Sequence, residues 1–72
     1  MATSRAVVAG NIRAEMARRN VTQARIATRL GKTQQSVSTK LRGHRPISVD
    51  ELYEIAAELG VEPAALLAGS AS

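Results

Sequence analysis

An all-α fold is expected for this chain of 72 residues. Aliphatic side chains recur three or four residues apart along most of the sequence, which is the spacing of one face of a helix. Tyr53 is the single aromatic residue and cysteine is absent, so the core has to be aliphatic, without disulfides or thiolate metal sites. Capping and breaking residues divide the chain into five helices with short connections. We therefore predict a compact five-helix bundle that forms one domain over residues 1–72.

The first helix is predicted over residues 5–19, after a loose arm (1–4) in which Thr3 or Ser4 can provide the N-cap. Gly10 within it should permit close packing, and Asn20 can end it in the left-handed conformation. Its inward stripe consists of aliphatic residues four apart: Val8, Ile12 and Met16. Its remaining arginines are expected in solvent: Arg13, Arg18 and Arg19.

Two short helices with a tight corner between them follow, as in a helix-turn-helix. The second helix is predicted up to residue 30 with Thr22 as its cap, and Gly31 ends it. Thr33 can cap a third helix over residues 34–42. This third helix surrounds its apolar stripe with hydrogen-bonding side chains and almost no acids, which suits the edges of bases in the DNA major groove.

The fourth helix has a capping-box signature, Ser48 followed three residues later by Glu51, and Gly60 ends it. Pro63 fits the first turn of a short fifth helix. Leu66 and Leu67 then either close the core or form an apolar contact surface, and residues 69–72 are a frayed end. The inward face of the fourth helix is predicted from its aliphatic residues: Val49, Leu52, Ile55, Ala56 and Leu59.

Charge is segregated along the sequence. All ten Lys and Arg residues lie between Arg5 and Arg45 and only Glu15 opposes them, which gives +9 for residues 1–45 and −5 for residues 46–72. A basic half predicts a polyanionic partner, with the acidic half facing away from it. The alternative is that the arginines only decorate solvated helices. No membrane span or signal peptide is evident, so we expect a soluble, cytoplasmic protein that does not bind membranes.

Catalytic and metal-binding patterns are not found. His44 has no second histidine or suitably spaced acid, so a metal or catalytic role is not expected. Ser36 and Ser38 have no base and orienting acid nearby in sequence, and there is no glycine-rich phosphate loop. We predict that the chain is not an enzyme and carries no cofactor.

The sequence resembles the Cro/C1-type helix-turn-helix domain of phage repressors over residues 8–68. The resemblance implies a lambda repressor-like bundle that binds an operator in double-stranded DNA. The matching residues follow in order along the chain: Gln23, Ile26, Ala27, Leu30, Gly31, Thr33, Val37, Ser38, Gly43, Ser48, Leu52, Ile55, Ala56, Leu59, Gly60, Val61, Pro63, Leu66 and Leu67.

The resemblance also implies roles for single residues. In the family, the residues at the positions of Gln34 and Gln35 contact base edges. Ser38 and Thr39 are the next candidates, either for bases or for phosphate and bridging water. Arg45 can bind a phosphate or enter a narrow minor groove. The predicted phosphate ligands are Gln23, Thr33, Ser36, Lys40, Arg42 and Arg45.

One departure from the family is informative. Where relatives often have a buried arginine–glutamate pair, this chain has Met16 and Leu41, and we expect an apolar contact to replace the ion pair. Where relatives tend to have an apolar residue, this chain has Lys40, which we expect to be free for the DNA backbone.

The predicted function is therefore a sequence-specific transcriptional regulator, most like a phage immunity repressor, with the third helix in the major groove. A domain this small needs a dimer on DNA, so the chain is either a homodimer or the N-terminal part of a longer dimeric repressor. Its place would be the cytoplasm of a bacterial host, at the nucleoid when bound. The alternative is a protein-interaction module, such as an antitoxin or anti-repressor partner, which predicts a larger exposed apolar surface.

Overall fold

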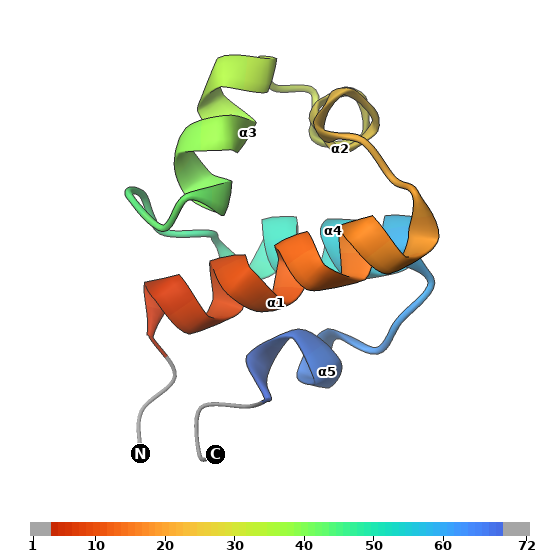
Figure 1. Ribbon diagram of the computed structural model, residues 1–72. Coiled ribbons are helices and arrows are strands. Elements are labelled where there is room, and N and C mark those ends of the chain that lie inside the picture. The colour runs from red at the N-terminus through yellow and green to blue at the C-terminus, as the bar shows by residue number, and fades with distance from the viewer. Residues whose placement is uncertain (1–3, 69–72) are drawn as a thin grey trace.

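A computed structural model describes residues 4–68 as an all-α structure in which no strand occurs. The predicted arm before Ser4, the role of Thr3 as a cap and the frayed end at residues 69–72 lie outside the described residues. The helices, in chain order, are α1 (Arg5–Arg19), α2 (Gln23–Leu30), α3 (Gln34–Leu41), α4 (Val49–Leu59) and α5 (Pro63–Leu67) (Figure 1). The predicted five-helix fold is thus confirmed. Only α3 is shorter than expected, because Arg42 leaves the helical conformation at φ −90° and ψ 0°.

The N-caps are those that the sequence predicts. In each case the hydroxyl of a serine or threonine accepts a hydrogen bond of 3.1–3.2 Å from the backbone N–H three residues later. The four caps are Ser4, Thr22, Thr33 and Ser48. Left-handed residues end three helices: Asn20 after α1, Gly31 after α2 and Gly60 after α4. The borders of the elements are therefore fixed by local chemistry.

The helices pack in an order that leaves α3 at one end of the molecule. In Figure 1, α2 and α3 lie on one side of α1 and α4, and α5 lies on the other side. The helix α2 packs against both α3 and α4, whereas α5 packs against α1 and α4. As a result α3 has support from α1 and α2 while one flank stays open.

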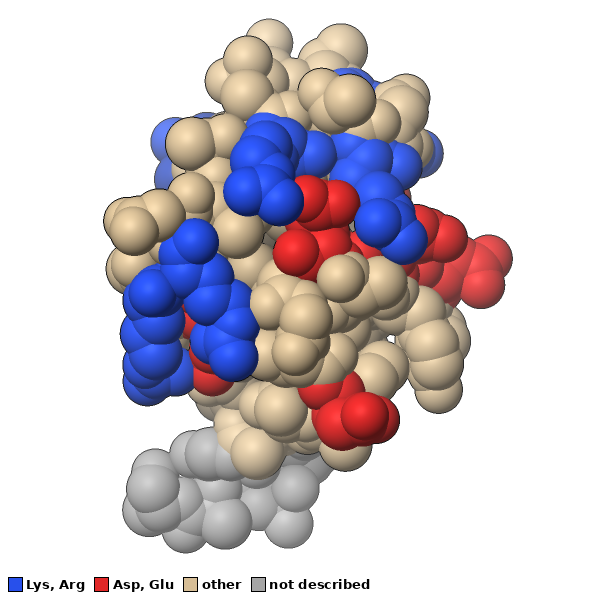
Figure 2. Space-filling model, turned by 90° about the vertical axis from the view of Figure 1, so that its right-hand side faces the viewer, with Lys and Arg blue, Asp and Glu red and all other residues tan. Residues whose placement is uncertain are grey.

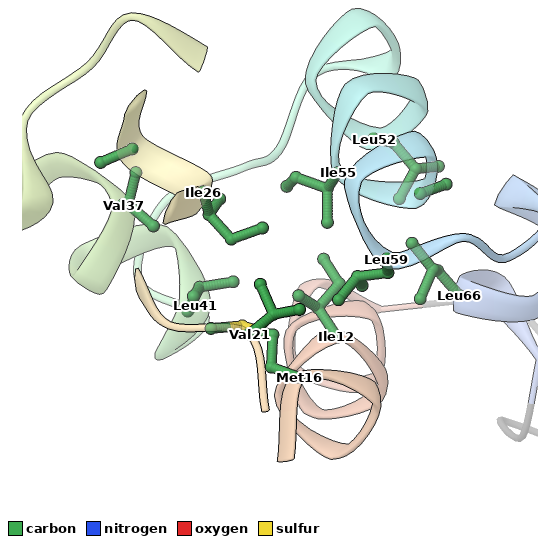
Figure 3. Close-up of a cluster of buried hydrophobic side chains, with 12 residues drawn as sticks. Ile12, Met16, Val21, Ile26, Val37, Leu41, Leu52, Ile55, Leu59 and Leu66 are labelled. Atoms are coloured by element: carbon green, nitrogen blue, oxygen red, sulfur yellow. The ribbon is translucent and has the colours of Figure 1, made fainter. Parts of the chain in front are cut away.

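The core is aliphatic, as predicted (Figure 3). Met16 and Leu41, 8% and 1% exposed, are both buried in this cluster, as their proposed apolar contact requires. No polar or charged residue is buried among residues 4–68. The larger members come from all five helices and one turn: Ile12, Met16, Val21, Ile26, Val37, Leu41, Leu52, Ile55, Leu59 and Leu66.

Two packing predictions are wrong. Val49 was expected to face inward, but it is 69% exposed. It is the first residue of α4 and lies on the same stripe as Tyr53, which is 60% exposed, so this stripe runs along the solvent side of the helix. Gly10 was expected to permit close packing, but a Cβ placed there would meet only the end of the Arg13 side chain, at 3.8 Å.

The structure decides between the two alternatives for Leu66 in α5. Leu66 is fully buried and Leu67 is 41% exposed. Of the two alternatives for this pair, Leu66 therefore closes the core beneath α1 and α4.

Candidate nucleic-acid interface

The candidate surface for binding a nucleic acid is built on α3. Val37 and Leu41 face the core at 2% and 1% exposure, which turns the other sides of the helix outward. Gln34 and Gln35 are exposed, and within residues 4–68 neither side-chain amide bonds to another residue. Both glutamines therefore present a donor and an acceptor to solvent at the start of the helix.

The two hydroxyl residues in the middle of α3 are half-buried. The Oγ1 of Thr39 donates a hydrogen bond of 2.9 Å to the backbone carbonyl of Gln35. Its proton is thereby used within the helix, and its lone pairs remain as acceptors. Ser38 lies on the flank of α3 shared with Gln34 and Arg42, four residues to either side, whereas Thr39 lies on the stripe of Gln35.

A polar hollow of about 460 Å³ runs beside α3. It combines hydroxyl and amide groups with three cationic side chains. Its walls are formed by Lys32, Thr33, Gln35, Ser36, Thr39, Lys40 and Arg45. A groove with this lining suits a phosphate backbone, because it offers both charge and hydrogen-bond donors.

The C-terminal end of α3 is supported by α1. The Nη1 of Arg13 donates to the carbonyl of Leu41, and the Nη1 of Arg5 donates to the carbonyl of His44 at 3.2 Å. Arg13 was expected to be solvated, so this is a correction: its guanidinium satisfies a carbonyl at the negative end of the helix dipole. Gly43, at φ 82°, approaches the backbone of Ala6 closely at the same junction.

The acids of α4 neutralise the arginines of α2. The Nε of Arg25 donates to Glu58 at 3.1 Å, and the Nε of Arg29 donates to Glu54 at 2.7 Å. The hydrogen bond from Arg25 outweighs desolvation and holds the pKa of Glu58 below its ordinary value. Acidic side chains consequently lie among basic ones on the face shown in Figure 2. On this face the segregation of charge along the sequence does not become a separation in space.

Glu15 pairs with the two arginines at the end of α1. Its carboxylate pairs with Arg18 at 2.6 Å and with Arg19. Both arginines were expected to be solvated charges, whereas each forms an i,i+3 or i,i+4 pair within its own helix.

Lys40 is not free, contrary to expectation. Its ammonium pairs with the Glu51 carboxylate, and the two side chains are only 14% and 12% exposed. Glu51 also completes the predicted capping box by accepting the Ser48 N–H at 2.9 Å. Burial raises the pKa of Glu51, but the bonds from Lys40 and Ser48 lower it more, so that it lies below the ordinary value of 4.5.

Arg42 and Arg45 are the cations that keep their charge available. Both are exposed, and neither has a carboxylate partner in the described part of the chain. Lys32, in the turn between α2 and α3, is 3.9 Å from Glu51 and is 48% exposed. Lys32 was not among the predicted phosphate ligands, although it stands directly before Thr33, the cap of the third helix.

The N-terminus of α2 lies outside this hollow. Gln23 is the first residue of α2 and is half-buried, directly after the Thr22 cap.

Between residues 4 and 68, no group of three or more His, Cys, Asp or Glu side chains could hold a metal ion. In the same range no helix has the length and hydropathy that a membrane span requires.

Fold and surface together define a helix-turn-helix protein with a polar, partly cationic face on its second motif helix. Comparison with known proteins agrees: the sequence matches the helix-turn-helix family over residues 12–66. The chain therefore belongs to this family, and its type is that of Cro and C1. It is a DNA-binding regulator.

A solved structure is also similar. It is described as the crystal structure of the hypothetical transcription factor NHTF from Neisseria, and it matches with a TM-score of 0.81 and 30% sequence identity. The match covers 93% of this chain and 77% of that chain. None of the curated proteins matches the chain significantly.

Proposed function

We propose that the chain is a sequence-specific repressor of the phage type, which places α3 in the major groove of its operator. The observation that carries the proposal is the pair of glutamine amides, Gln34 and Gln35, that start α3 without partners in residues 4–68. A glutamine can bond the N6 and N7 atoms of adenine together. Ser38 and Thr39 then act as shorter groups on either flank, toward bases, phosphates or bridging water.

Phosphate contacts would come from the residues around α3. Arg42 and Arg45 have no carboxylate partner in residues 4–68, and Ser36 lines the hollow together with Arg45 and Lys32. Arg45 retains the alternative of entering a narrow minor groove.

Capping groups give the motif further phosphate donors. The Thr33 hydroxyl accepts from the Ser36 N–H, so Thr33 contributes its own proton and the start of the helix dipole. Gln23, in the first turn of α2, would clamp a phosphate at the positive end of that helix.

Occupation of DNA by such a domain would repress by blocking a site that polymerase needs. Useful affinity calls for two copies on half-sites about 34 Å apart, so we propose either a homodimer or a longer chain that dimerises elsewhere. The protein would act in the bacterial cytoplasm, on the nucleoid.

Selection from randomised duplex DNA at two salt concentrations tests this function. We expect a short motif with two-fold symmetry and an affinity that falls steeply as salt rises. Gln34→Ala and Gln35→Ala should each cost about 1–3 kcal/mol on the selected site and relax preference at a single base pair. The control is Thr28→Ala, an exposed position on α2 outside the surface. Equal losses on selected and random DNA would refute the base contacts.

A protein-interaction module remains the second candidate because of one feature. Val49 and Tyr53, 69% and 60% exposed, form an apolar pair on the solvent side of α4. Binding to a protein that persists at high salt, together with the absence of duplex binding at low salt, would favour this candidate.

A further inference from the structure

Lys40 lies on α3, yet its charge is directed at the protein. We infer that Lys40 is not a phosphate ligand, and that Glu51 and Lys40 together are positioning residues that orient α3 for DNA. The inference rests on the proposed function and revises one of its predicted contacts.

Both oxygens of the Glu51 carboxylate are in use. Oε1 accepts the backbone N–H of Ser48 at 2.9 Å, and Oε2 accepts the Lys40 ammonium, with the Lys32 ammonium 3.9 Å away. One side chain thus connects the first turn of α4 to the last turn of α3. Because the capping box fixes the carboxylate, the ion pair fixes the rotation of α3 relative to α4.

The C-terminal end of α3 is also held by α1. Arg13 of α1 donates to the carbonyl of Leu41, one residue after Lys40. Two charged contacts from two different helices therefore hold consecutive residues of α3. The side chains that point to DNA, such as Gln35, take no part in either contact through their amides.

Transfer of Lys40 to a DNA phosphate would be unfavourable. It would leave the Glu51 carboxylate, 12% exposed, with Lys32 as its nearest cation at 3.9 Å. A partly buried charge that loses its partner is destabilised strongly. Arg42 and Arg45 reach DNA without this loss, since they have no carboxylate partner in residues 4–68.

Salt dependence separates the two roles, because each phosphate contact releases counterions and each internal pair does not. We compare Lys40→Met with Arg42→Met on the selected duplex and on random duplex. Arg42→Met should reduce the slope of log K against log salt by about 0.9 and weaken binding to both duplexes alike. Lys40→Met should leave the slope unchanged and lower the preference for the selected duplex several-fold, because α3 is no longer held in place.

Further variants isolate the ion pair. Glu51→Gln keeps the capping box, since glutamine serves there as well, but removes the charge. It should reproduce the loss of selectivity in Lys40→Met, with an unchanged slope. Lys40→Arg keeps the cation and should keep wild-type selectivity. In urea melts of the free protein, the double variant Lys40→Met/Glu51→Gln should be more stable than the sum of the single effects.

The outcomes are distinct. A slope that falls by about 0.9 in Lys40→Met would overturn the inference and leave the proposed function intact. Additive stabilities in the melts would also overturn it, and this readout needs no DNA. Absence of duplex binding by the wild-type protein at low salt would instead refute the proposed function.

Discussion

Replacement of three glycines by alanine should change stability in three different ways, because the three backbones differ. Gly10 lies within α1, where its added Cβ would meet only the flexible end of Arg13 at 3.8 Å. Gly60 has φ 73° with nothing within 4 Å of the Cβ position. Gly43 has φ 82°, and its Cβ would lie 3.4 Å from the Cα of Ala6.

The magnitudes follow from these environments. Gly10→Ala should stabilise by about 1 kcal/mol, the difference in helix propensity. Gly60→Ala should destabilise by about 1 kcal/mol, which is the left-handed strain reduced by the lost entropy of the unfolded chain. Gly43→Ala should destabilise by about 1–2 kcal/mol, since the same strain applies and the added Cβ would lie at the near limit of van der Waals contact with the backbone of α1. In a chain of this size 1 kcal/mol corresponds to about 4–8 °C in melting temperature.

Thermal and urea melts followed by far-ultraviolet circular dichroism measure the series. We expect the order Gly10→Ala, wild type, Gly60→Ala, Gly43→Ala from most to least stable. Equal costs at Gly60 and Gly43 would show that the approach to Ala6 carries no energy. A destabilising Gly10→Ala would show that α1 is closely packed at that turn after all.

Three further results are expected. Leu41 is 1% exposed behind the outward face of α3, and Leu41→Ala should cost about 2–5 kcal/mol. The whole free energy of unfolding of such a chain is about 4–10 kcal/mol, so the urea transition of this variant should be lost or strongly shifted. Met16→Arg should destabilise by placing a charge in the core, and adding Leu41→Glu should recover part of the loss without exceeding wild type; a single variant as stable as wild type would contradict this. The lowered pKa values of Glu51 and Glu58 stabilise the fold above about pH 4.5, and this contribution is lost as the pH falls through the folded-state values; urea midpoints at pH 7 and pH 3 should therefore differ less in Glu51→Gln than in wild type.

Local chemistry made most of the fold predictable from sequence. Caps such as Ser48 act on the backbone three residues away, and left-handed residues such as Asn20 end a helix at the position where they stand. The inward stripes needed only helical spacing. The prediction that Val49 faces inward was wrong because this residue lies at the first position of α4, where spacing alone does not tell whether a neighbouring helix extends that far.

The electrostatic arrangement could not be predicted, because it depends on distant parts of the chain. Arg25 and Glu58 are 33 residues apart, and Arg13 meets the carbonyl of Leu41 across 28 residues. A charge sum over a sequence segment treats such pairs as free ions. It therefore overstated the charge that the basic half offers to DNA and missed the support that α1 gives to α3.

The way α3 is held has a consequence for how its specificity can change. Three contacts hold the helix: the core packing of Val37, the hydrogen bond from Arg13 to the carbonyl of Leu41, and the pair of Lys40 with Glu51. The amides of Gln34 and Gln35 contribute to none of these contacts within residues 4–68. Substitutions there should leave stability within about 0.5 kcal/mol of wild type, as at other exposed positions. The same scaffold can thus present other side chains to DNA, so that preference for a base and stability of the fold are set by separate residues.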